Sequence, residues 1–388
     1  MWKNNKAMRK KFNPKILILS IAFRPNIGGL ETHLTDLTAE IKKKYQVLTV
    51  TLPPISTRVS SKTIERDGNL LIWRIPWFGK DLFYKFLKWP IIELFYLIPP
   101  LFVGLLIALI KYPSIQVIHA QGFSGGLSSV FLGKIFAKRV LISTAYIFHF
   151  KNDLVGKVAK RVFSSADRVL CVSRASTQEM EQLGIPEEKL GKCAYWIDLN
   201  IFKPSNKIKA KRKLGWPSNF SILFIGRLVE EKGVRYLLNA LPFLPKGIIL
   251  YIVGDGILKE VIEDAARKYT NLRFLGRVDN NLTPLYYNAA DVVVVPSFEE
   301  TLGRVNMEAL ACATPVVAVT SSGSKEVIKN NIGILVKLNS KEIAQAIIRL
   351  FSSKQLYEKL HRNARGSIKK RYSSKNFNVF VKEYNMLK

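Results

Sequence analysis

The sequence predicts two α/β domains in tandem, each built on a doubly wound parallel β-sheet with helices on both faces. Three observations predict this fold. The chain has 388 residues, which is too long for one ordinary hydrophobic core. Short apolar runs typical of buried parallel strands alternate with helical patterns. The alternation restarts after Lys203-Pro-Ser-Asn206, a polar stretch with a proline that is typical of a linker.

The first Rossmann-like domain is expected over residues 1–203. Its opening apolar run, Lys15–Ile21, follows a basic N-terminus as in a signal peptide, but it lacks a small-residue cleavage site. We therefore interpret it as the first buried strand, followed by a glycine turn and an amphipathic helix. Further strands are expected at Tyr45–Thr51, Leu70–Ile75, Ser114–Ala120, Arg139–Thr144 and Arg168–Val172.

The second Rossmann-like domain is expected over residues 204–372. Its strands are expected at Ser221–Ile225, Ile248–Val253, Asn271–Phe274, Val292–Val295 and Pro315–Val319. The last segment, 373–388, has an amphipathic helical pattern and is expected to pack back on the first domain. Ligands of doubly wound sheets bind outside the carboxyl ends of the strands, so the two domains are expected to face each other across a ligand cleft. The fold alone does not define a function.

The charge of the chain is strongly positive. There are 60 Lys and Arg against 29 Asp and Glu, a net charge of +31 that is spread evenly over the two domains. Such a charge predicts an anionic partner, which is a membrane surface, a phosphorylated substrate or nucleic acid, unless the whole proteome is basic. The absence of zinc-type cysteine pairs, of an RNA-recognition signature and of a long basic helix argues against nucleic acid. Three cysteines share no metal-like spacing and make no even disulfide set, which indicates structural thiols in a reducing compartment.

The segment Trp89–Ile110 is long and apolar enough to be considered as a membrane span. Three prolines divide it, Pro90, Pro99 and Pro100. Prolines inside a helix remove hydrogen bonds that lipid cannot replace, so we expect two short apolar helices instead. Three lysines that alternate with aromatic residues precede it, Lys80, Lys85 and Lys88, as in a helix at a membrane interface or acceptor groove. An ordinary core helix and a transmembrane helix remain as alternatives.

Two motifs suit the phosphates of a ligand. Gly28 and Gly29 stand between a strand and a helix, where backbone amides favour an anion and glycine permits close approach. A plain tight turn explains them equally well. Arg227 and Lys232 follow the first strand of the second domain, and a guanidinium fork beside an ammonium suits a pyrophosphate. The alternative is two surface cations paired with the neighbouring glutamates.

The segment from Pro296 to Val317 contains the most informative pair of carboxylates. Glu300 lies in a turn after a strand, and Glu308 lies inside the following helix. A carboxylate accepts hydrogen bonds from two neighbouring hydroxyls, so both residues suit a sugar or a ribose. Amides at the helix start face a phosphate with the positive end of the helix dipole. The structural alternative is that Glu308 is buried on a backbone amide and that Glu300 caps the helix.

At these residues the chain resembles glycosyltransferase family 4, a retaining family whose two Rossmann-like domains form the GT-B fold. The motifs are Pro25-Asn-Ile-Gly-Gly-Leu-Glu31, Val117-Ile-His-Ala120, Ala166-Asp-Arg-Val-Leu-Cys-Val-Ser173, Gly226-Arg227 with Glu231-Lys232-Gly233, Gly254-Asp-Gly256, and Glu300 with Glu308. They follow the order and spacing of the family and cover nearly the whole chain. Single motifs are common, whereas the ordered set is specific.

The resemblance implies a nucleotide-sugar donor, such as a UDP- or GDP-sugar, with no cofactor and no tightly bound metal. Arg227 and Lys232 would hold the diphosphate, Glu308 the ribose and Glu300 a hydroxyl of the donor sugar. Further donor contacts are implied for Gly28, Gly29, Gly226, Gly254, Arg277, Val278, Leu302, Gly303 and Arg304. The implied reaction is a hexosyl transfer with retention, by attack on the face that the nucleotide leaves.

The chain departs from the family pattern at three places. Tyr146 stands where many members have a histidine that contacts the donor, and His149 follows three residues later. Either side chain would take the catalytic place, or the activity is altered. Ala313 replaces a usual glycine, and Tyr195-Trp-Ile-Asp198 replaces the usual crossover motif Asn-Gly-Val-Asp. His119 either lines the acceptor side or is a hydrogen-bonded histidine at a strand end.

These observations predict a glycosyltransferase that is peripheral at the cytoplasmic face of the cell membrane. Its partners are expected to be a nucleotide sugar, a lipid-linked acceptor and an anionic membrane surface, without nucleic acid. Two alternatives stay open. One is a catalytically silent subunit that binds sugar nucleotides, and the other is a sugar-nucleotide epimerase of the same fold.

Overall fold

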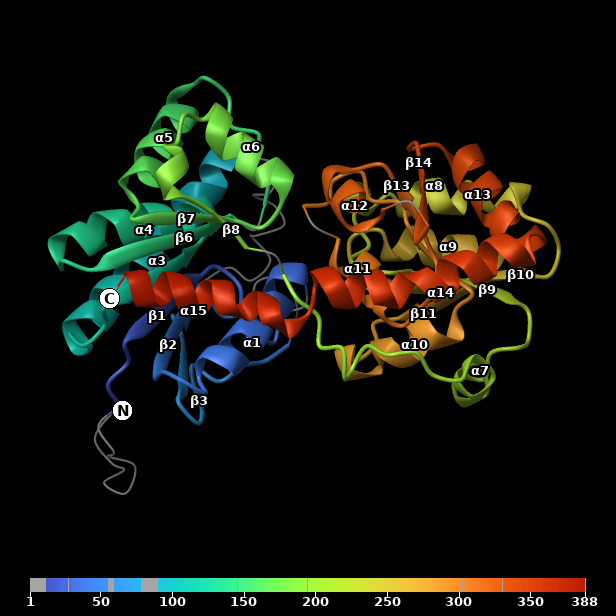
Figure 1. Ribbon diagram of the computed structural model, residues 1–388, viewed down its shortest axis with the longest axis horizontal. Coiled ribbons are helices and arrows are strands. Elements are labelled where there is room, and N and C mark those ends of the chain that lie inside the picture. The colour runs from blue at the N-terminus through green and yellow to red at the C-terminus, as the bar shows by residue number, and fades with distance from the viewer. Residues whose placement is uncertain are drawn as a thin grey trace. The chain divides into compact units, whose positions relative to one another are not determined.

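The computed structural model describes residues 12–26, 28–54, 59–77, 90–144, 146–193, 195–301, 303–329 and 331–387. The chain forms two compact units (Figure 1). The first unit comprises Met1–Val172, Ser176–Cys193 and Phe377–Lys388, and the second comprises Ser173–Ala175 and Ala194–Asn376. The boundary therefore follows Cys193 rather than the expected position at residue 203. The C-terminal helix is part of the first unit.

The first unit contains an eight-stranded sheet in the order β3-β4-β2-β1-β5-β6-β7-β8. Its strands are β1 (Ile16–Ser20), β2 (Val47–Thr51), β3 (Ile64–Asp67), β4 (Leu70–Arg74), β5 (Val117–Gln121), β6 (Arg139–Thr144), β7 (Arg168–Cys171) and β8 (Leu190–Lys192). Neighbouring strands are parallel except for β3, which runs antiparallel to β4 at the edge. Strands β3 and β8 were not expected, because one is polar and exposed and the other has three residues.

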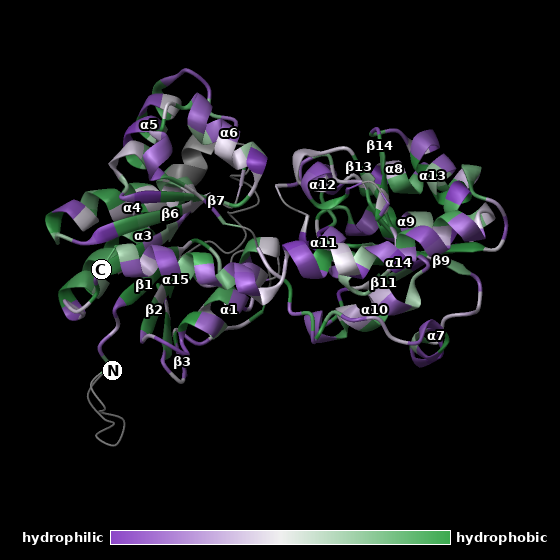
Figure 2. Cartoon of the chain, viewed as in Figure 1, coloured by the Kyte–Doolittle hydropathy of each residue, from purple (hydrophilic) through white to green (hydrophobic). Residues whose placement is uncertain are grey.

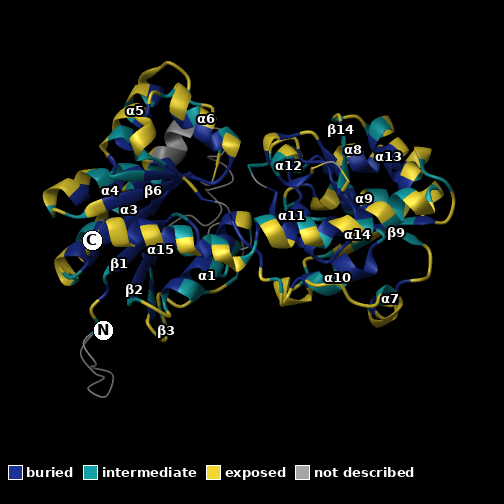
Figure 3. Cartoon of the chain, in the orientation of Figure 1, coloured by how far each residue is buried: buried dark blue, intermediate teal, exposed yellow. Residues whose placement is uncertain are grey.

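Two groups of helices cover the two faces of this sheet. Helices α3 (Pro90–Lys111), α4 (Gly122–Ile135), α5 (Leu154–Ser165) and α6 (Arg174–Gln182) lie on one face, and α1 (Gly29–Ile41) and α15 (Phe377–Met386) lie on the other. The side chains of Leu17 and Leu19 point to the first group and join its core. His119 points the other way and contacts Phe380 of α15. The strands of both sheets are mostly apolar and buried (Figures 2 and 3).

The expectation of two short helices around residues 89–110 was wrong, because α3 is one helix of 22 residues with Pro99 and Pro100 inside it. The buried stripe Leu97, Leu101, Leu105 packs against the sheet, and this packing holds the helix together across the missing amide hydrogens. Within the described ranges, no helix is both long enough and apolar enough to cross a membrane. The predicted interfacial lysines Lys80, Lys85 and Lys88 lie outside the described residues.

The second unit contains a six-stranded, fully parallel sheet in the order β11-β10-β9-β12-β13-β14. Its strands are β9 (Phe220–Ile225), β10 (Ile248–Val253), β11 (Leu272–Gly276), β12 (Val292–Val295), β13 (Val316–Val319) and β14 (Gly333–Val336). The expectation of two doubly wound α/β domains is thereby confirmed. The strand order reverses between β9 and β12, and this reversal is the point at which doubly wound sheets bind ligands, outside the carboxyl ends of the strands.

The helices of the second unit again cover both faces of the sheet. Helices α8 (Val234–Leu238), α9 (Lys259–Lys268) and α13 (Ser340–Ser352) share a core with one face, and α7 (Lys207–Leu214), α10 (Thr283–Ala289) and α11 (Arg304–Ala311) lie over the other. The ring of Trp216, which follows α7, stacks on Tyr251 of β10 at 3.6 Å between ring centroids. Helix α14 (Lys354–Arg371) packs against α11 and α13, and α12 (Ser322–Val327) follows β13.

Candidate active site

The loops at the carboxyl ends of β9, β10 and β11 are joined by their backbones. The amide of Gly226 donates to the carbonyl of Val253 at 3.1 Å, and the amide of Gly254 donates to the carbonyl of Gly276 at 2.9 Å. A Cβ atom on Gly254 would lie 1.9 Å from the carbonyl oxygen of Gly226, so a side chain cannot be accommodated there. These predicted glycine turns therefore form one continuous rim of backbone groups at the edge of the sheet.

The loop after β9 is pressed equally closely against the loop after β12. Gly233 has a φ of +66°, and a Cβ atom on it would lie 2.1 Å from the carbonyl oxygen of Pro296. The amide of Phe298 donates to the carbonyl of Glu231 at 3.2 Å. Because the two loops flank the point where the strand order reverses, Lys232 and Glu300 are brought together there.

Lys232 and Glu300 form an ion pair. The Lys232 Nζ lies 2.8 Å from the Glu300 Oε2, and both side chains are about one-fifth exposed. The carbonyl of Glu300 accepts a hydrogen bond from the amide of Gly323 at 2.8 Å, which fixes the loop against α12. Glu300 thus lies in the loop before α11, as expected.

Glu308 lies in α11 with its side chain buried and both carboxylate oxygens hydrogen-bonded. The Nε of Arg304, one turn earlier, donates to Oε1 at 2.7 Å, and the hydroxyl of Tyr287 donates to Oε2 at 2.8 Å. Burial and then the negative charge of Glu308 raise the pKa of Tyr287 well above its usual value, so the phenol keeps its proton and donates. The carboxylate is therefore held in one orientation by these two neighbours.

Sequence reasoning missed Tyr287 altogether and assigned Arg304 through its backbone amide. Tyr287 is located on α10, and a tyrosine within a helical apolar pattern is indistinguishable from a core residue. The Arg304 side chain could have been noticed, because an Arg four residues before a Glu on a helix is a pairing signal. The structural alternative expected Glu308 to be buried on a backbone amide; the side chain is buried, and its carboxylate binds the side chains of Tyr287 and Arg304.

The first turn of α11 offers backbone amides beside these carboxylates. Gly303 precedes the helix with a φ of +75° and no side-chain cap. The first amides of a helix have no partner within it and carry the positive end of the helix dipole. Asn306 is fully buried near this turn, and its Oδ1 accepts no hydrogen bond from the described residues. Leu302 lies outside the described residues.

Arg227 and Arg277 are more exposed. A guanidinium nitrogen of Arg227 lies 3.4 Å from Glu231 Oε1, so this cation takes part in the weak surface pairing that the alternative described. Arg277 is exposed and Val278 is half-buried, directly after β11 at the edge of the sheet. Gly276 before them has a φ of +65°, which turns the chain at the end of the strand.

The candidate residues of the first unit lie at the carboxyl edge of its own sheet. Gly28 ends the loop after β1, and a Cβ atom on it would lie 2.3 Å from Glu31 Oε2, so the Glu31 carboxylate folds over this glycine. Gly29 begins α1 in open space. Tyr146 is 45% exposed, and His149 is exposed with a φ of +53°. Both side chains are accessible at the end of β6.

His119 is a hydrogen-bonded histidine in β5 and does not line an acceptor site. It is fully buried, its Nδ1 lies 2.7 Å from the hydroxyl of Tyr384, and its Nε2 lies 2.7 Å from the hydroxyl of Ser143. Burial lowers the pKa of His119 to about 3, so the ring is neutral. A buried histidine with both nitrogens engaged joins β5 to the C-terminal helix, and it offers no surface to an acceptor.

Two family models match the chain. Residues 27–191 match the model described as Glycosyltransferase Family 4, and residues 206–367 match the model described as Glycosyl transferases group 1. The chain is a glycosyltransferase of the family 4 type. The two matches cover most of the first and second units respectively, so the motifs of both sheets belong to one family assignment, as the sequence indicated.

Curated relatives include two uncharacterized glycosyltransferases of Methanocaldococcus jannaschii. One is 27% identical over 395 residues, which covers 95% of this chain and 97% of the relative. The other is 32% identical over 220 residues, and this match spans 53% of this glycosyltransferase and only 56% of the relative. Both names say glycosyltransferase, and neither name states a substrate.

Solved structures show the same GT-B fold. Sucrose-phosphate synthase from Thermosynechococcus elongatus has a TM-score of 0.82 at 21% identity, and the match covers 96% of this chain and 98% of that one. HepE of Anabaena, solved in complex with UDP-glucose, has a TM-score of 0.76 at 20% identity and covers 96% and 100%. At these identities the likeness concerns the fold.

Proposed function

We propose that this glycosyltransferase transfers a sugar from a nucleoside diphosphate donor, with retention, to a lipid-linked acceptor at the cytoplasmic face of a membrane. The observation that carries the donor half is the edge of the second sheet. There, the Lys232–Glu300 pair and the Glu308 carboxylate, held by Arg304 and Tyr287, stand on loops at the reversal of strand order.

Each group has a task in this proposal. Lys232 and Arg227 neutralise the diphosphate, the amides at the start of α11 bind its oxygens, and Glu308 accepts from the ribose hydroxyls. Glu300 accepts from a hydroxyl of the sugar after Lys232 has turned to the phosphate. HepE was solved with UDP-glucose, and this makes UDP-sugars the first donors to test.

The chemistry is stabilisation of a leaving group. The bond between the anomeric carbon and the diphosphate oxygen breaks as the acceptor hydroxyl attacks from the same face, and the acceptor proton passes to the departing diphosphate. Cations already placed at that diphosphate stabilise its developing charge without reorganisation. In this scheme the task needs no tightly bound metal and no protein nucleophile.

The acceptor half rests on the net charge of +31 and on apolar helices in the first unit. A lipid-linked acceptor has an anionic phosphate, which the positive charge would bind, and an apolar chain, which the helices would bind. Tyr146, exposed at the end of β6, is the side chain of this unit to which we assign a role in the reaction.

The test is transfer by the purified protein from radiolabelled UDP- and GDP-sugars to membrane lipid extracts. Lys232→Ala should lower kcat about a hundredfold, since it removes a charge that acts on the leaving group. Arg235→Ala is the matched control, because Arg235 is an exposed cation nearby that pairs with Glu230. Unchanged turnover in Lys232→Ala with a folded protein would refute this assignment.

A second candidate function is a silent subunit that binds sugar nucleotides without turnover. Tyr146 at the usual histidine position is the observation that favours it. The same assay separates the two, because a silent subunit would bind a nucleotide sugar and transfer it to no lipid extract. Tyr146→His would then be expected to produce turnover.

A further inference from the structure

One face of the first unit carries large apolar side chains that nothing in the described protein covers. On the outer side of α3, Phe95, Val103, Ile107 and Ile110 are between 45% and 76% exposed. Their spacing of three, four and eight residues places them on one side of the helix, opposite the buried stripe Leu97, Leu101 and Leu105. Helix α3 is therefore apolar on its outer as well as its inner side.

Helix α4 continues this apolar face. Phe131 and Ile135 in its last two turns are 59% and 62% exposed. The two helices touch through the rings of Phe102 and Phe131, whose centroids are 5.8 Å apart. Single exposed apolar residues are ordinary, but six large ones on two adjoining helices mark a binding surface. We call these six residues the α3–α4 face.

Most of the charge around this face is positive. From Leu94 to Asn152 the chain contains no Asp or Glu, while Lys111 and Lys134 stand in the last turns of the two helices and Lys138 and Arg139 follow. A second copy of the chain would bring the same positive charges to the contact and would be repelled. An anionic surface with an apolar interior matches both properties.

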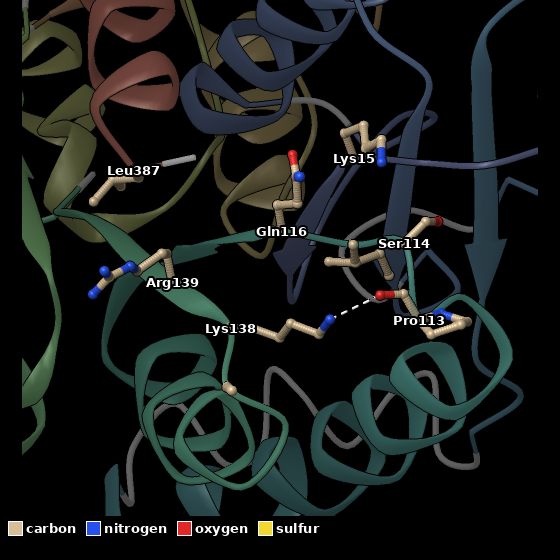
Figure 4. Close-up of a pocket in the computed structure, with 9 residues that line it drawn as sticks. Lys15, Pro113, Ser114, Gln116, Lys138, Arg139 and Leu387 are labelled. Atoms are coloured by element: carbon tan, nitrogen blue, oxygen red, sulfur yellow. Dashed lines mark hydrogen bonds between the residues drawn. The ribbon is translucent and has the colours of Figure 1, made fainter.

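A basic pocket lies just beyond the ends of the two helices, at the amino edge of the sheet (Figure 4). It has a volume of about 330 Å³, and Lys15, Lys138 and Arg139 are among the residues that line it, with the Arg139 guanidinium pointing away from the two lysine side chains. The Lys138 Nζ donates to the carbonyl of Pro113 at 2.8 Å, and Arg139 is paired with Asp167 at 2.9 Å. Lys15 forms no ion pair with any described residue. Two lysines beside a small hollow next to apolar helices suit the phosphate of a lipid headgroup.

We propose that the α3–α4 face, together with this basic pocket, docks the protein on a bilayer of anionic phospholipid. Ile110 and Ile135 stand at the pocket end of the helices, so acyl chains and a headgroup phosphate would be bound side by side. Both helices run against the direction of the strands, so the surface extends from the pocket towards the carboxyl edge where Tyr146 lies. This proposal specifies the membrane part of the proposed function and is independent of the sugar transfer.

Vesicle sedimentation tests the surface. The full chain should bind vesicles that contain phosphatidylglycerol and should not bind vesicles made of phosphatidylcholine only. The double variants Ile107→Ser with Phe131→Ser, and Lys134→Gln with Lys138→Gln, should each bind about tenfold more weakly, since each loses apolar area or charge at the interface. The controls are Ile208→Ser with Ile257→Ser and Lys259→Gln with Lys268→Gln in the second unit. Ile208 and Ile257 are at least as exposed as Ile107 and Phe131, and Lys259 and Lys268 are exposed lysines, so the control variants should bind as the parent does.

Three results would overturn the proposal. The parent protein stays in solution with anionic vesicles, or both face variants bind as tightly as the controls, or light scattering shows a dimer that Ile107→Ser with Phe131→Ser abolishes. Sugar transfer is measured in detergent on the same protein preparations, so that the docking proposal and the enzymatic proposal are tested separately. Vesicle binding without transfer contradicts the enzymatic proposal alone, and transfer without vesicle binding contradicts the docking surface alone.

Discussion

At the scale of single residues, the central feature is a carboxylate that its neighbours hold in position. Glu308 is buried on α11, and Tyr287 and Arg304 each bind one of its oxygens. A buried ion pair stabilises a fold only weakly, because desolvation offsets the attraction. We therefore interpret the arrangement as one that orients the carboxylate for a ligand.

Removing the Tyr287 hydroxyl should weaken donor binding without slowing the reaction. Tyr287→Phe loses one hydrogen bond to Glu308, so we expect the KM for the donor to rise about fivefold, in line with roughly 1 kcal/mol for such a bond, at nearly constant kcat. Tyr286→Phe is the control, since the Tyr286 ring packs on Trp216 and its hydroxyl forms no hydrogen bond with any described residue. A lower kcat with an unchanged KM would contradict the positioning role.

His119 predicts a pH dependence of stability. Its pKa is lowered to about 3 by burial, so between that value and about 6.5 the unfolded chain binds a proton that the folded chain excludes. Stability should therefore fall as the pH drops below about 6.5, by about 1.4 kcal/mol per pH unit from this residue. Thermal melts between pH 5 and 7 should show a shallower slope for His119→Gln than for the parent, and equal slopes would refute the prediction.

At the scale of elements, the C-terminal helix α15 is attached to the first unit by polar contacts as well as by its apolar face. Glu383 pairs with Arg168 at 2.8 Å and is 6% exposed, and Tyr384 binds His119. An apolar helical pattern predicted that the segment packs back, but it could not show these partners, which are more than 200 residues away in the sequence.

Breaking the pair on α15 should destabilise the first unit. Glu383→Ala leaves Arg168 partly buried without its carboxylate, so we expect a loss of about 3 kcal/mol in the free energy of unfolding. The measurement is urea denaturation. Glu260→Ala, at an exposed position in the first turn of α9, should change little. A loss no greater than that of the control would show that α15 is held by its apolar face alone.

At the scale of the whole molecule, the sequence predicted both sheets from apolar runs, because strands buried on both faces consist of continuous apolar residues. It missed edge strands such as β3, whose residues Ile-Glu-Arg-Asp alternate and face solvent. It also placed a helix break at Pro99, where packing on the sheet proved stronger than the loss of two hydrogen bonds.

Only those residues of the candidate site that stand at recognisable positions in the sequence could be predicted. Lys232, Glu300 and Glu308 carry charge at fixed positions after strands, and such residues can be read along the chain. Tyr287 acts through a contact with Glu308, and contacts between helices are not encoded at any fixed spacing. The two helices that form the α3–α4 face are likewise separated in sequence and come into contact only in the folded protein.

The central claim is that the edge of the second sheet binds a nucleotide sugar, and the melting temperature tests it most directly. A ligand that binds the folded state raises the melting temperature. Among UDP-, GDP- and ADP-sugars, we expect at least one to raise that of the parent protein, and Glu308→Ala to lose most of the shift while remaining folded. No shift with any nucleotide sugar, or a full shift in Glu308→Ala, would contradict the account.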